Sequence, residues 1–187
     1  MDICLPFRTM AYNNAWANHR FLKACAALSQ IEFEAVRTGF FPSLQDTLNH
    51  VYTVDLFYID AMEGGSLGYD AWENPRPFLT PSSLSEAQLK LDKRLIAYTE
   101  DLNAQTLATI VSVHRGDRTQ KERADRLLLH VFQHQIHHRG QAHAMLSATA
   151  VAPPQLDEFF SIAEAPLRAA EFAELGFSES EIWRIRD

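Results

Sequence analysis

The chain has 187 residues, of which 47% are hydrophobic and 22% are charged, and its formal net charge is −7. These values allow one substantial hydrophobic core. The 17 Lys and Arg residues are scattered, which disfavours a nucleic-acid-binding protein. No run of 18 apolar residues and no basic leader occurs, so we expect a cytoplasmic protein without a membrane segment. Two cysteines, Cys4 and Cys25, are too few for a disulfide framework, which fits a reducing compartment.

Two helices are expected in the first third of the chain. Apolar residues recur at helical spacing over Phe7–Ser29, which predicts the first helix. The segment 30–42 has no sustained periodicity and should be a connection. Ser43 then precedes a second periodic run with Asp46 three residues on, a pattern that resembles a capping box. We expect this second helix to extend to about Glu63.

The middle of the chain predicts a loop, a helix and a hairpin. Glycines and prolines in 64–81 argue against regular structure. Several possible N-caps at Ser82–Ser85 begin a third helix, and its core-facing residues follow a heptad seam with one polar member: Leu84, Gln88, Leu91, Leu95, Tyr98 and Leu102. The β-branched run 106–113, with a turn at 114–118, predicts a short strand or hairpin.

A fourth helix is expected over Lys121–Ala148, up to the stop at Pro153–Pro154. One amphipathic helix ending near Gly176 and a short one begun by Ser178, with Glu181 three residues on, should follow.

The predicted architecture is all-α: a four-helix bundle with a short strand or hairpin between its third and fourth helices and a C-terminal helical extension. We assign residues 1–150 to the bundle and residues 151–187 to the extension, which should pack on the bundle within a single domain.

Four of the eight histidines lie in 127–141. His130, His134 and His138 are spaced at i, i+4 and i+8, and therefore lie on one stripe of the fourth helix. Two histidines on adjacent turns can bind one metal ion, but a third ligand must come from elsewhere. His50, on an apolar face of the second helix, is the candidate. A single histidine on such a face is more often a hydrogen-bonded core residue, so both interpretations of His50 remain open.

Several other chemistries are disfavoured by the sequence. In the zinc-protease motif H-E-x-x-H the glutamate is the general base, whereas Gln135 follows His134 here. No G-x-S-x-G motif is present, and neither cysteine has a histidine at helical spacing. His137 and His143 point away from His134, and we expect them to be surface or hydrogen-bonding groups.

Three motifs in order resemble those of the DinB-like (DinB/YfiT) family of metalloenzymes. They are YNNAWAN at 12–18, FPSLQDTLNH at 41–50 and HVFQHQIHHRGQ at 130–141. The resemblance covers about residues 7–150 and departs from the family pattern at Gln133, where asparagine is common.

The resemblance implies a four-helix bundle, a homodimer in many members, and a divalent metal ion, zinc or nickel, bound by His50, His134 and His138. It places His130 and Gln141 beside these ligands. It also implies enzymes that transfer low-molecular-weight thiols, with hydrolase-like and isomerase-like relatives.

We therefore expect a metal-dependent enzyme, transferase or hydrolase, that activates a water or a thiol against a small electrophilic substrate. Its expected partners are a second copy of the chain, the small-molecule substrate and a low-molecular-weight thiol. Neither nucleic acid nor a membrane is expected. The catalytic residues are not predicted. The alternative is a stress-associated or damage-inducible protein that binds a metal or small ligand without turnover. A purely structural metal is a weaker hypothesis, since the predicted core is large enough without one.

The fourth helix carries a second apolar set, Leu129, Phe132 and Ile136, on the side away from His134. We expect it to be covered either by residues 155–177 or by a second copy of the chain.

Overall fold

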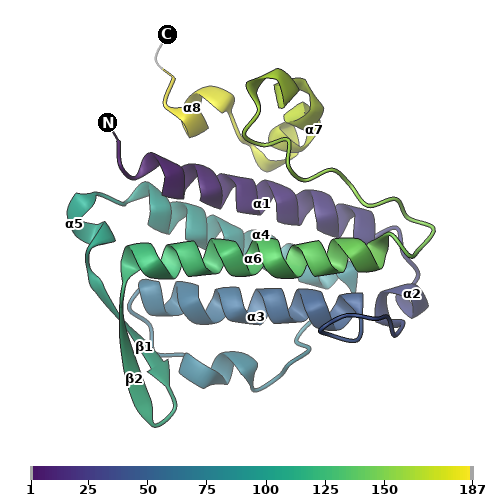
Figure 1. Cartoon of the computed structure of the whole chain (residues 1–187), viewed down its shortest axis with the longest axis horizontal. Helices are drawn as coiled ribbons and strands as arrows, with labels where there is room; N and C mark the ends of the chain where they lie inside the picture. Colours follow the sequence, from purple (N-terminus) through teal and green to yellow (C-terminus); the bar gives the residue numbers. More distant parts are fainter. Residues whose placement is uncertain (1, 186–187) are drawn as a thin grey trace.

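Four long helices form the body of the protein in the computed structural model, which describes residues 2–185. They are α1 (Leu5–Cys25), α3 (Leu44–Met62), α4 (Pro81–Glu100) and α6 (Ala124–Leu146). Helix α1 packs along α4, and α3 packs along α6 (Figure 1). The predicted all-α bundle is confirmed.

Shorter elements connect and extend these helices. They are α2 (Gln30–Glu34), η1 (Gly68–Trp72), α5 (Ala104–Leu107), β1 (Ile110–Arg115), β2 (Arg118–Arg123), η2 (Ile162–Glu164), α7 (Ala165–Leu175) and α8 (Glu179–Trp183). Two of them, α2 and η1, lie in segments for which the sequence predicted only loop. Both have at most five residues, too short for a periodic pattern.

The predicted hairpin is present, but it takes residues from the predicted fourth helix. Strands β1 and β2 pair antiparallel, with Ile110 opposite Arg123, and Gly116 has a φ of +64° in the turn. Val111 and Val113 point into the core. Because β2 continues to Arg123, α6 begins three residues after the predicted Lys121.

Several predicted helix ends are correct and others shift. Ser43 Oγ accepts a hydrogen bond from the backbone N–H of Asp46, as expected for an N-cap. Gly176 ends α7 with a φ of +71°, in the left-handed region that favours glycine. Thr80, rather than a residue of Ser82–Ser85, caps α4. Helix α1 ends at Cys25, before the predicted Ser29, whose side chain caps α2 instead.

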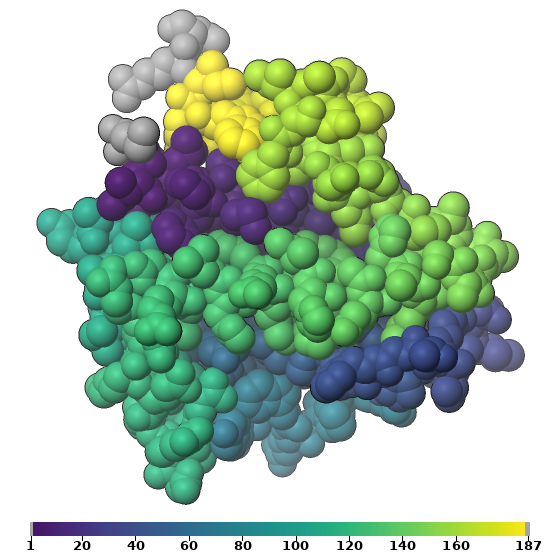
Figure 2. Space-filling view, viewed as in Figure 1, coloured from purple at the N-terminus to yellow at the C-terminus, as the bar shows by residue number. Residues whose placement is uncertain are grey.

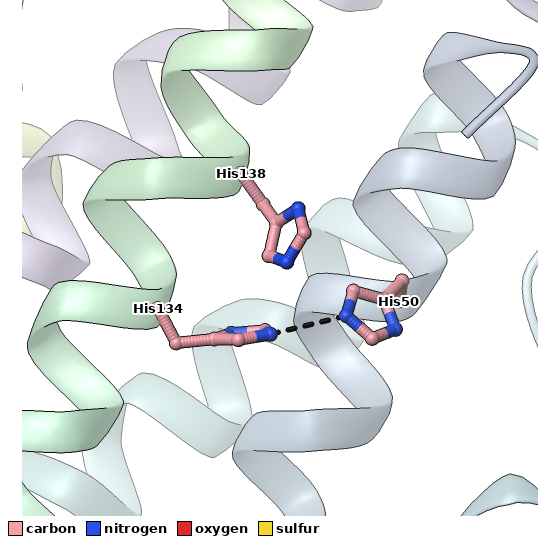
Figure 3. Close-up of side chains that lie close together, drawn as sticks. All are labelled: His50, His134 and His138. Atoms are coloured by element: carbon pink, nitrogen blue, oxygen red, sulfur yellow. Dashed lines mark hydrogen bonds between the residues drawn. The ribbon is translucent and has the colours of Figure 1, made fainter. Parts of the chain in front are cut away.

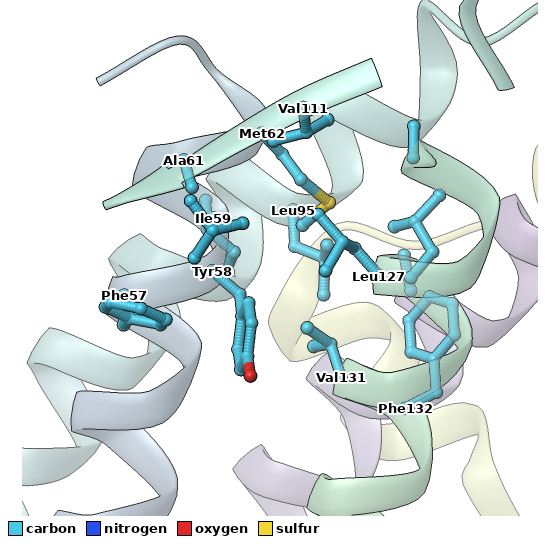
Figure 4. Packing of buried hydrophobic residues seen from close by; sticks show 14 of the residues in the cluster. Phe57, Tyr58, Ile59, Ala61, Met62, Leu95, Val111, Leu127, Val131 and Phe132 are labelled. Atoms are coloured by element: carbon cyan, nitrogen blue, oxygen red, sulfur yellow. The ribbon is translucent and has the colours of Figure 1, made fainter. Parts of the chain in front are cut away.

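The main hydrophobic core lies between α3, α4, α6 and β1. Figure 4 shows Phe57 and Ile59 of α3, Leu95 of α4 and Val131 of α6 in this cluster. All four side chains are buried, and such packing supplies most of the stability of amphipathic helices in water.

The C-terminal segment packs on α1. Phe159, Phe172 of α7 and Ile182 of α8 form a separate apolar cluster with Trp16 of α1. Figure 2 shows this yellow-green and yellow segment covering the purple helix. The guanidinium of Arg168 is buried there and is satisfied by Glu179 and two backbone carbonyls.

The prediction of a second apolar face on α6 is wrong for one of its three residues, Phe132. Phe132 is only 3% exposed and belongs to the main core, because it follows the buried Leu128 by one helical turn. Leu129 and Ile136 are exposed, at 59% and 53%. Phe132 is therefore covered by the bundle itself, and neither the C-terminal segment nor a second copy is needed to bury it.

Candidate metal centre

Three histidines from two helices converge on one point. His50 comes from α3, and His134 and His138 come from successive turns of α6 (Figure 3). One ring nitrogen from each lies within 4.8 Å of the other two, and Nε2 of His50 is 3.0 Å from Nε2 of His134. The structure thus brings together the three residues that the sequence singled out.

This donor set fits a metal ion. Nitrogen ligands of a tetrahedral Zn²⁺ lie about 3.3 Å apart, because each Zn–N bond is about 2.0–2.1 Å long. The observed nitrogen positions need only small side-chain movements to reach that spacing. Three protein ligands also leave one position open, as in zinc sites that carry out catalysis.

The imidazoles are neutral at pH 7, the form that binds metals. Burial, with a smaller contribution from repulsion by His138, lowers the pKa of His50 to about 4. Burial, followed by repulsion from His138 and then from the other neighbouring histidines, lowers the pKa of His134 to about 3. Burial also lowers the pKa of His138, although its hydrogen bond to Gln141 opposes the shift.

The two residues predicted to lie beside the ligands differ in what they contact. Gln141 Oε1 is 2.8 Å from Nδ1 of His138, so it can hold the ring with Nε2 directed inward. His130 makes no such bond: its ring centre lies 6.2 Å from that of His134 and 5.1 Å from that of Tyr58. His137 bonds to Gln141 and His143 to the carbonyl of Pro154, as expected of hydrogen-bonding groups.

Aromatic rings cover the site. The ring of Phe41 lies 4.4 Å from that of His50 and 5.6 Å from that of His138. Phe40 also lies near His138, at 6.2 Å. The segment that carries both phenylalanines immediately precedes α3 and lies against α6 in Figure 2. A low-polarity cover of this kind strengthens electrostatic effects on anything bound beneath it.

A family model for the DinB family matches residues 5–171, most of the chain. The chain belongs to the DinB family. Within this DinB-family chain the match runs past residue 150, where we placed the end of the bundle, and into α7.

Two relatives agree with this assignment. The protein named DinB from Bacillus subtilis (strain 168) is 26% identical over 157 residues, which cover 81% of this chain and 90% of that protein. A crystal structure of a DinB-like protein from Bacillus cereus ATCC 10987 superposes with a TM-score of 0.61 over 77% of this chain and 91% of that one. At 14% identity the second match shows the shared fold alone.

A buried polar network next to the histidines was missed by the sequence analysis of this DinB-family member. It joins all four long helices and consists of Asn14, Asn18, Asp55, Gln88, Asp92, Gln135 and Arg139, each of them buried. The Arg139 guanidinium donates to Asn14, Asn18 and Gln135 through Nη1.

The side-chain amides of the network donate hydrogen bonds to its two aspartates. Asn18 and Gln88 donate to Asp92, and Gln88 and Gln135 donate to Asp55. Burial, followed by repulsion from Asp92, raises the pKa of Asp55 well above its usual value. Burial also raises the pKa of Asp92 to about 6 and lowers that of Arg139 to about 10. Both carboxyl groups therefore keep a proton to a higher pH than an exposed aspartic acid does.

On α6, each network residue directly follows a proposed metal ligand in the sequence. Gln135 follows His134 and Arg139 follows His138, and successive helical residues point about 100° apart. Each histidine thus faces the site while its neighbour points into the bundle. The available sequence signals were the polar Gln88 within an apolar seam and the i, i+4 pair Asn14 and Asn18 in the first motif.

No helix within residues 2–185 is both long and apolar enough to cross a membrane.

Proposed function

We propose that His50, His134 and His138 bind one divalent metal ion, zinc or nickel, and that the protein is a metal-dependent enzyme acting on a small electrophilic substrate. The observation that carries this is the convergence of three neutral ring nitrogens within 4.8 Å of one another. A bound ion of this kind would lower the pKa of a coordinated water or thiol and so supply a nucleophile at neutral pH.

The chain's own residues support such a site. Gln141 orients His138, and burial keeps His50 and His134 neutral and ready to bind. Phe41 shields the histidines from bulk water on one side. No carboxylate takes part in the cluster of possible ligands found among residues 2–185, which favours a borderline-soft ion over Mg²⁺ or Ca²⁺.

The test combines metal analysis with a turnover assay. Untagged protein is analysed for metal content and then incubated with a low-molecular-weight thiol and 1-chloro-2,4-dinitrobenzene, whose conjugate is followed by absorbance. The proposal expects about one ion per chain and thiol consumption that stops on chelation and in His50→Ala. Metal binding without turnover across a panel of thiols, and without hydrolysis of activated esters, would favour the non-catalytic alternative.

We also propose that the protein is a cytoplasmic homodimer. Leu129 and Ile136 of α6 and Phe160 in the segment before η2 are exposed on the surface of the single chain. Apolar side chains of this size on one side of a molecule often mark a contact with a second copy.

A further inference from the structure

A cleft of about 530 Å³ lies on α3, and His50 is the one histidine of the site that lines it. Asp46, His50 and Thr53 lie at i, i+4 and i+7, so they share one helical face and form the floor of the cleft. The walls come from the segment before α3 and from the segment that leaves η1, which runs below α3 in Figure 1. This volume is in the range of pockets that hold small organic ligands.

The two walls are apolar. Phe41 and Pro42 form one wall, and Trp72 and Pro75 contribute to the other. The two aromatic rings are held in place by packing. The ring centre of Phe41 lies 4.4 Å from that of His50, and the ring centre of Trp72 lies 4.4 Å from that of Phe57. Aromatic and proline surfaces of this kind favour the hydrocarbon part of a ligand over water.

The lining of the cleft includes the guanidinium of Arg76, whose positive charge is only partly engaged. Asp46 accepts from Arg76 Nε through one carboxylate oxygen and from the Ser43 hydroxyl through the other, so its own charge is satisfied. Within residues 2–185, Asp46 is the sole side-chain partner of Arg76, and both terminal amino groups of the guanidinium remain free. A guanidinium held in this way can bind a carboxylate through these amino groups.

We propose that this cleft binds the substrate of the metal site as an amphipathic organic carboxylate. Its apolar body lies between Phe41 and Trp72, its carboxylate binds Arg76, and its electrophilic centre reaches the histidines. One helical turn, about 6 Å, separates Asp46 from His50 along α3, which sets the approximate distance between the carboxylate and the reacting atom. The inference rests on the proposed function for the reaction at the histidines, whereas binding through Arg76 needs no metal.

The test measures binding without turnover. 3-Phenylpropionate and its neutral analogue 3-phenylpropionamide are titrated into chelator-treated protein by NMR. The acid should bind about three- to tenfold more tightly than the amide, since a half-exposed guanidinium contributes less than a buried one. Arg76→Gln should abolish this preference while leaving amide binding unchanged. Trp72→Leu, checked for an unchanged unfolding midpoint, should weaken both ligands.

Arg94→Gln is the matched control. Arg94 is also an exposed arginine in an ion pair, with Glu63, but it lines a separate groove with Tyr52 and Phe78. This variant should keep the full preference for the acid. A preference that survives in Arg76→Gln, or acid binding that appears only when Zn²⁺ is added, would overturn the proposal. If chelated protein prefers the acid through Arg76 but metal-loaded protein turns over no electrophile, the carboxylate site stands and the proposed function fails.

Discussion

Nε2 of His50 and Nε2 of His134 lie 3.0 Å apart, although 84 residues separate them in the chain. Two neutral ring nitrogens can approach this closely only if one carries a hydrogen and donates it to the other. A metal ion bound to both would replace that hydrogen. The contact between α3 and α6 therefore already holds two of the three proposed ligands at nearly the spacing that an ion requires.

Removal of one ligand should remove most of the metal. In the His134→Ala and His138→Ala variants, we expect the metal content to fall from about one ion per chain to a small fraction of that. Elemental analysis after dialysis measures it. His130→Ala is the control, because His130 lies beside the cluster without a hydrogen bond to it. It should keep its metal. Retention of a full equivalent by the double variant His134→Ala/His138→Ala would refute the site.

Metal affinity should fall at a lower pH than it does at a site formed by histidines with ordinary pKa values. Protons compete for the same nitrogens, but the pKa of His50 is lowered to about 4 and that of His134 to about 3. Affinity should therefore stay nearly constant from pH 8 to about 6.5, the reference value for histidine. It should then fall with a slope that increases as the pH drops through about 4 and about 3. Competition titrations with a chromophoric chelator measure this. A steep fall between pH 8 and pH 6.5, or constant affinity down to pH 3, would contradict ligation by these imidazoles.

Loss of the buried guanidinium should destabilise the fold strongly. Arg139→Met removes the buried positive charge that favours the ionised forms of Asp55 and Asp92, and it removes the donor to Asn14, Asn18 and Gln135. Breaking a buried charge network in this way typically costs about 3–5 kcal/mol. Urea denaturation followed by circular dichroism measures the change. Arg123→Gln, which breaks the exposed ion pair with Asp125, is the control and should leave the unfolding midpoint nearly unchanged. Equal effects of the two variants on the midpoint would argue against a stabilising role of the buried network.

A dimer contact on α6 should be sensitive to charge at its exposed residues. Ile136→Asp should shift the protein toward monomer in sedimentation experiments at micromolar concentration while leaving its metal content intact. Phe132→Asp, by contrast, should unfold the single chain, since Phe132 is part of its core. A wild-type protein that sediments as a monomer at that concentration would end the dimer proposal.

Local patterns in the sequence determined the long helices, their apolar faces and the pairing of His134 with His138, because these features depend on residues within one or two turns of each other. The ends of α3 and α7 were predictable for the same reason, since Ser43 and Gly176 act on their own termini. His50 was a candidate from its apolar helix face, but its place beside His134 depends on how α3 packs against α6.

Tertiary structure alone decided the features that join distant residues. The pairing of β2 with β1 moved the start of α6 from Lys121 to Ala124, because strand hydrogen bonds outweighed local helical preference. The neutral state of His50 follows from burial between helices. Asp55, Asp92 and Arg139 come together only when three helices, α3, α4 and α6, pack at once. Such groups are polar residues of ordinary appearance in the sequence, and only packing removes them from water and makes their partners obligatory.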